Sequence, residues 1–203
     1  MVIYKQVLGK EFDQLHPKLQ HRYALPPGTE FRAIGVMKKI VGGPKWLSPF
    51  FAWTAKRKFL FPETGNHIPF TIMNRSFVDD QGNYKVYWER AFEFEKNRRY
   101  FNALMSLDPE GQRILDYLGE SPLFYSDLFC SVDGHGGIRM MSGKQRLIIG
   151  TWSIPLPRLF QGIVEVVERY DDERERFTIF VMIRNPLIGR LFHYEGEFTE
   201  DEH

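Results

Sequence analysis

The chain has 203 residues, which suits one domain with a sizeable core, and its hydrophobic fraction of 43% argues against disorder. Lysine and arginine number 27 and aspartate and glutamate 26, so the balance argues against a general attraction to nucleic acid. The single cysteine, Cys130, excludes an internal disulfide, and its apolar neighbours predict a small buried side chain rather than a nucleophile. No apolar run resembles a signal peptide or a membrane span, so we expect a cytoplasmic protein, with peripheral membrane contact left open.

The first half of the chain begins with helical signals. Apolar residues recur at helical spacing over residues 1–25, and Pro17 predicts two short pieces rather than one helix. A first strand is expected over 31–41. A short helix is expected over 48–58, because Ser48 can cap it and Pro49 suits its first position.

A hairpin over 67–95 follows, and apolar residues alternate along its second strand, as in a half-buried strand. The later strand candidates are 98–108, 113–119, 122–133, 137–150, 163–170, 176–185 and 191–198. The glycine-rich stretch 133–137 is interpreted as a hairpin turn, because it lacks the strand-to-helix context of a phosphate loop.

The order of these elements predicts the fold class. About ten strands with short connections indicate a mainly β (α+β) protein, an antiparallel barrel or sandwich. Two or three short helices would cover one end. We expect a single domain over 1–203, with a helical segment over 1–25 and a β-rich body over 31–199. A barrel is favoured because closure removes exposed strand edges.

Several stretches carry a resemblance to a known family. They are YKQVLGKEFDQLHPKLQHRY, PFTIMN with YWERAFEF, YLGESPLF, SGKQRLIIG and the long C-terminal run from PLPRLFQG to HYEGEF. The chain resembles an uncharacterised bacterial family, a domain of unknown function, over almost its whole length. The resemblance implies relatives that occur alone or after a Rossmann-type dehydrogenase-like domain or a membrane segment. It therefore suggests a dehydrogenase-like protein partner, but it supplies no catalytic residues and no cofactor.

Arg90 interrupts the apolar face that Trp88 shares on the hairpin's second strand. A buried guanidinium needs partners, because burial without them costs several kcal/mol. Two interpretations stay open. Arg90 either binds an anionic group at the end of an apolar cavity or forms a structural ion pair, for which the candidate carboxylates are Glu165, Glu197 and Asp127.

Further candidate ligand-binding residues are Arg146, Arg184 and His193. The two arginines would converge with Arg90 on an anion if the sheet closes suitably. His193 would form an acid–base group with Asp127, Glu165 and Glu197 if the strand order brings them together. No histidine spacing predicts a metal site.

The segment 46–61 combines aromatic and basic residues. Its candidates are Trp46, Phe50, Trp53, Lys56 and Arg57. They describe either a lid over the mouth of the barrel or a short interfacial helix at anionic headgroups, and the two interpretations are compatible.

The leading functional hypothesis is a binding module for an apolar or amphipathic anionic small molecule or lipid, with no cofactor. It rests on the many phenylalanines, on Arg90 and on the segment 46–61. One alternative is an enzyme acting on a small carboxylated or lipid-like substrate. The other is an accessory domain that docks on a dehydrogenase-like partner.

Overall fold

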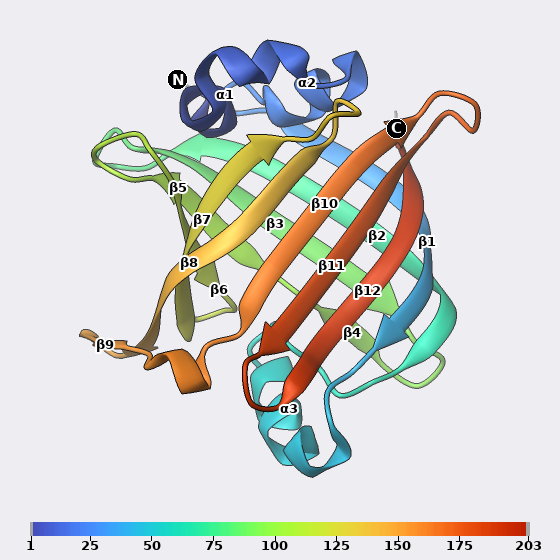
Figure 1. Ribbon diagram of the computed structural model, residues 1–203, viewed down its shortest axis with the longest axis vertical. Helices are drawn as coiled ribbons and strands as arrows, with labels where there is room; N and C mark the ends of the chain where they lie inside the picture. Colours follow the sequence, from blue (N-terminus) through green and yellow to red (C-terminus); the bar gives the residue numbers. More distant parts are fainter. Residues whose placement is uncertain (1, 202–203) are drawn as a thin grey trace.

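Ten antiparallel strands close into a barrel in the computed structural model, which describes residues 2–201 (Figure 1). The strands of the barrel are β1 (Glu30–Val41), β2 (Gly65–Val78), β3 (Tyr84–Glu93), β5 (Ala103–Leu107), β6 (Ile114–Leu118), β7 (Phe124–Val132), β8 (Ile138–Ile149), β10 (Ile163–Asp171), β11 (Arg176–Asn185) and β12 (Gly189–Glu200). Neighbours in the barrel are neighbours in the chain, β12 pairs with β1, and β8 pairs with β10. The expected fold class is confirmed, as a barrel rather than a sandwich.

The interior of the barrel is aromatic, because period-2 alternation turns large rings inward from several strands. The Phe61 ring packs edge-on against Phe192, with ring centres 4.8 Å apart, and Phe92 lies against Tyr194 at 5.3 Å. These side chains are fully buried. Offset and edge-on contacts of this kind fill the core and hold the strand faces together.

Two short strands lie outside the closed ring. β4 (Arg98–Tyr100) pairs with β3, and β9 (Trp152–Pro155) pairs with the end of β8.

The seam between β8 and β10 is paired over only part of its length. Backbone pairing runs from Ile138 to Met141 on β8. Farther along, side chains replace the ladder: Gln145 exchanges two hydrogen bonds with the backbone of Gly162, at 2.6 and 2.9 Å, and the Val164 amide donates to the Ser142 hydroxyl at 2.8 Å.

Helices lie at both ends of the barrel rather than at one (Figure 1). The helices α1 (Ile3–Leu8), η1 (Gly9–Gln14) and α2 (Pro17–Tyr23) cover what we call the N-terminal end. The helices η2 (Lys45–Leu47), α3 (Ser48–Ala55) and η3 (Arg158–Phe160) belong to the opposite end, called the α3 end. Within residues 2–201, no helix has the length and apolar character that crossing a membrane requires.

The helix starts follow the prolines. Pro17 opens α2, as its fixed backbone angle favours. α3 differs from the expectation: it ends at Ala55, and the Ser48 side chain caps nothing, because η2 runs directly into the helix and leaves Leu47 at the capping position.

Candidate functional site

A cavity of about 110 Å³ lies inside the barrel towards the α3 end. Its walls are mostly apolar side chains from eight strands and from the helices α3 and η3. Phe50 of α3 and Phe160 of η3 line its outer part, and Phe160 is 72% exposed. The cavity therefore reaches the surface between these two helices. Deeper in, two charged residues line it, Arg90 and Asp116.

Arg90 points inward from β3 and is 5% exposed. Its Nε donates a hydrogen bond to the Phe101 carbonyl at 2.7 Å, and its Nη1 donates to the Tyr194 hydroxyl at 3.3 Å. The guanidinium lies 4.3 Å from the centre of the Phe101 ring, a favourable cation–π distance. These contacts fix the orientation of the guanidinium without neutralising its charge.

Asp116 points inward from β6, between Ile114 and Leu118. Its strand neighbours are Met105 of β5 and Ser126 of β7. Burial raises the pKa of Asp116 to about 7, and the charge of Arg90 opposes that rise. Among residues 2–201, its Oδ1 has no hydrogen-bond partner. A carboxyl group with such a pKa exists in both protonation states near neutral pH.

The structural ion pair considered for Arg90 does not form. In the described part of the chain, no carboxylate oxygen lies within 4.0 Å of its guanidinium. Glu165 pairs with Arg139 at 2.7 Å, and Glu197 pairs with Lys38 at 2.8 Å. The third candidate, Asp127, accepts a hydrogen bond from Tyr125. The three carboxylates thus have other partners, and the acid–base group with His193 is not assembled.

A second buried arginine, Arg22, shows what a fully paired guanidinium looks like in this barrel. It projects from α2 and is 1% exposed. Its Nε and Nη2 both donate to the Glu168 carboxylate, and its Nη1 donates to Asn74 Oδ1 at 2.9 Å. Burial acts to lower the pKa of Arg22, but Glu168 outweighs this and the pKa is raised. Arg22 therefore anchors the N-terminal helices.

The other predicted arginines do not join Arg90. Arg146 and Arg184 are exposed and do not line the cavity. Arg184 follows the inward Ile183, so it points outward by strand parity. Arg146 is turned outward by a bulge, because three residue steps of β8, from Ser142 to Gln145, face two steps of β7.

His193 lies on the outer side of β12, where its Nδ1 is 3.0 Å from the Val181 carbonyl. It does not line the cavity, whereas Trp88 does.

The aromatic and basic residues of segment 46–57 are placed in two ways. Phe50 lines the cavity, as a lid residue would. Trp46, Trp53 and Lys56 are exposed, and Arg57 is partly exposed. The segment thus covers the mouth and also presents aromatic and cationic groups to its surroundings.

Nothing in residues 2–201 groups three or more histidine, cysteine, aspartate or glutamate side chains for a metal ion. Burial raises the pKa of the Cys130 thiol to about 12, so the thiol is protonated at neutral pH and is not an activated nucleophile.

Comparison with known proteins gives a family without an assigned activity. The model of a domain of unknown function, DUF4166, matches residues 15–198. The uncharacterized protein YndH of Bacillus subtilis (strain 168) is 38% identical over 188 residues, which are 93% of this chain and 92% of that protein. A porin-like protein from Bacteroides uniformis ATCC 8492 matches with a TM-score of 0.25 and 10% identity, over 84% of this chain and 60% of that one. This chain thus spans less than two thirds of that structure.

Proposed function

The chain belongs to the DUF4166 family, and for this member we propose that the barrel binds a small monocarboxylate with an apolar tail. The carboxylate would lie at Arg90, and the tail would run along the apolar cavity towards Phe50 and Phe160. The observation that carries the proposal is the contrast between two buried arginines: Arg22 has its own carboxylate, and Arg90 has none.

A buried guanidinium without a counter-ion favours an anionic ligand. Removing a charge from water costs several kcal/mol, and an opposite charge at hydrogen-bond distance offsets much of that cost. Within residues 2–201, the Arg90 guanidinium donates hydrogen bonds only through Nε and Nη1. The guanidinium has five N–H donors, so others remain for a ligand.

Asp116 favours a carboxylate as the ligand's polar group, because a carboxylate has oxygen atoms that can accept a hydrogen bond from it. Its pKa of about 7 allows the neutral form, which donates one hydrogen bond. A bound carboxylate accepts from that proton and also disfavours ionisation of Asp116, so binding and protonation support each other.

The cavity volume sets the length of the tail. A dry cavity of about 150 Å³ holds benzene in another protein, so about 110 Å³ holds only a few heavy atoms. Pockets for drug-sized ligands are larger, roughly 300–1,000 Å³. A longer tail must therefore pass between Phe50 and Phe160 to the surface.

The test is calorimetric titration with straight-chain monocarboxylates of increasing length. We expect Arg90→Gln to weaken binding about ten- to a hundredfold, the value of a charge-assisted hydrogen bond. Arg146→Gln is the matched control, because Arg146 is exposed and outside the cavity. Equal affinities for the two variants would overturn the proposal.

The pH dependence gives a second, independent readout. If neutral Asp116 is the donor, the wild-type affinity at pH 8 is about tenfold lower than at pH 6. Asp116→Asn keeps a donor at every pH, so its affinity should not change over this range. A wild-type affinity that rises with pH would contradict the role of Asp116.

A second candidate function is proton transfer on a bound carboxylated substrate. The specific observation is again Asp116, because a cavity carboxyl group with a pKa of about 7 suits general acid–base work. Turnover that Asp116→Asn abolishes while binding persists would distinguish this enzyme from a carrier.

A further inference from the structure

The α3 end of the barrel gathers most of the exposed large apolar side chains. Most of them lie in three of the segments at this end: 45–62, 144–163 and 184–191 (Figure 1). In the described chain, the only exposed large apolar residues outside them are Ile34, Val36, Val78 and Phe129. Those inside are Trp46, Phe50, Trp53, Ile149, Trp152, Ile154, Leu159, Phe160, Ile163, Leu187 and Ile188. Apolar residues concentrated in this way mark an interaction surface.

The same three segments contain no aspartate or glutamate. Their basic residues are Lys45, Lys56, Arg57, Lys58, Lys144, Arg146, Arg158, Arg184 and Arg190. Within residues 2–201, Lys58 is the one that forms an ion pair, with Glu120 at 2.7 Å. The chain as a whole is balanced, at 27 basic and 26 acidic residues, so these three segments carry an excess of positive charge. The acidic residues Glu63, Glu93 and Glu120 lie on neighbouring segments of this end, where they pair with Arg99, Arg98 and Lys58.

α3 has an unusual composition for a helix at the surface. Its sequence, SPFFAWTA, has no charged residue, and apolar groups occur on every side. Only Phe51 and Thr54 are buried. A helix that is apolar all round is normally buried or in contact with lipid, so its outer side lacks the apolar environment that it matches.

From these observations we propose that the α3 end docks on an anionic lipid bilayer, with Trp46, Trp53 and Trp152 at the headgroup level. Three of the chain's four tryptophans are in this region, and Trp152 is 74% exposed. Tryptophan is enriched at membrane interfaces because one part of its ring is apolar and one part polar. The unpaired cations give the anionic preference, since basic residues at the surface attract anionic lipids.

The docking also gives the cavity a direct route to lipid, a point that rests on the proposed function. Phe50 and Phe160 line the cavity and also belong to the docking surface. An amphipathic carboxylate could then pass from the bilayer into the barrel without crossing water.

The test is co-sedimentation of the full chain with vesicles of phosphatidylcholine alone or of phosphatidylcholine with phosphatidylglycerol. We expect binding to the anionic vesicles only, with a blue shift of tryptophan fluorescence. Each neutralised cation should weaken binding about fivefold, so Lys56→Gln with Arg57→Gln should weaken it about thirtyfold. Trp46→Ser with Trp152→Ser should weaken binding and abolish most of the blue shift.

The matched control is Lys10→Gln with Lys18→Gln, because both lysines are exposed at the N-terminal end. That variant should bind as the wild type does. Arg90→Gln should also bind vesicles normally, which separates failure of the docking from failure of the proposed ligand site. Equal binding to both vesicle types, or no binding together with a stable dimer that buries Trp46 and Trp152, would overturn the proposal.

Discussion

The two ends of the barrel carry short helices in different ways. At the N-terminal end, α2 sends Arg22 into the interior, where Glu168 and Asn74 hold it. At the α3 end, α3 inserts Phe51 but leaves Phe50 and Trp53 at the surface, and within residues 2–201 no buried ion pair anchors it. The N-terminal end is thus anchored by a buried ion pair in the barrel interior. The α3 end has a shallow apolar cover above a cavity, which is the arrangement a ligand entrance requires.

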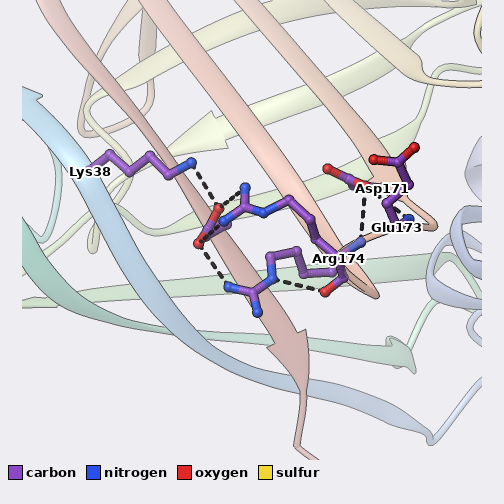
Figure 2. Close-up of polar contacts among 6 residues, drawn as sticks. Lys38, Asp171, Glu173 and Arg174 are labelled. Carbon is purple, nitrogen blue, oxygen red and sulfur yellow. Dashed lines mark hydrogen bonds and ion pairs between the residues drawn. The ribbon is translucent and has the colours of Figure 1, made fainter.

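Two surface regions of the barrel also differ in how their cations are paired. Figure 2 shows the Lys38 ammonium and the Arg174 guanidinium directed at one carboxylate, near the turn between β10 and β11. This carboxylate is Glu197, which also accepts from Arg176 at 2.8 Å. The turn itself is held by Asp171, which accepts from the amides of Glu173 and Arg174. The cations around Glu197 thus have a partner within the chain, whereas among the described residues eight of the nine basic residues in segments 45–62, 144–163 and 184–191 form no ion pair.

Removing the carboxylate partner of Arg22 should destabilise the N-terminal end of the barrel. Glu168→Leu leaves Arg22 charged and without its carboxylate, so we expect a loss of about 3–5 kcal/mol in the free energy of unfolding. The melting temperature should fall by roughly 6–20 °C.

Glu165→Leu is the control for that change. Glu165 is on the same strand but pairs with Arg139 at the surface, so the loss should stay below about 1 kcal/mol. Arg22→Met combined with Glu168→Leu should recover much of the lost stability, because an apolar pair replaces the buried ions. Equal losses for Glu168→Leu and Glu165→Leu would contradict the anchoring role.

In the other half of the barrel, replacing Asp116 should raise the free energy of unfolding, whereas Glu168→Leu lowers it. Folding raises its pKa from 3.8 to about 7, so the folded protein binds more protons and loses stability as the pH rises through this range. Asp116→Asn removes the cost of burying the ionised group. The variant should be more stable than the wild type at pH 8, by at most about 4 kcal/mol, and the difference should shrink towards pH 4. Urea unfolding at several pH values measures it, and a difference that is constant with pH would refute the assignment.

Of these variants, Glu197→Gln should change the free energy of unfolding least. Hydrogen bonds from Lys38, together with Arg174 and Arg176, lower the pKa of this carboxyl to about 2. Its contribution to stability is therefore complete above pH 4.5 and is lost as the pH falls towards 2. Glu197→Gln should cost about 1 kcal/mol at neutral pH, because the network is at the surface.

High salt should reduce that cost. Glu195→Gln, on the same outer side of β12, is the control, since its nearest cationic partner is His193 at 3.8 Å. A Glu197 effect that does not change with salt would point to packing rather than charge.

The barrel itself could be predicted because alternation is a local signal. Arg90 was found in this way, as a break in an apolar strand face. Asp116 carries the same signal between Ile114 and Leu118, but so short a strand does not by itself show which of its faces points inward. Arg22 could not be found, since Glu168 and Asn74 reach it only after the barrel closes.

Arg146 and Arg184 do not lie beside Arg90, for two separate reasons. A bulge changes which residues of β8 face inward, and no composition signal marks it. For Arg184, the alternation of Ile179, Val181 and Ile183 already places the arginine outside. The excess of basic residues in the three segments of the α3 end could be predicted from the sequence only in part, because these segments are far apart in the chain.

The partly paired seam has a consequence for motion. β8 and β10 share backbone hydrogen bonds only from Ile138 to Met141, on the side of the N-terminal helices. Towards α3 the seam depends on the side chains of Gln145 and Ser142. Segments with fewer backbone hydrogen bonds open locally at lower free energy, so the amides of Gly162 and Val164 should exchange with solvent faster than those of the paired half. Because Gln145, Gly162 and Val164 also line the cavity, each such opening would enlarge the cavity, while the N-terminal end of the barrel would stay closed.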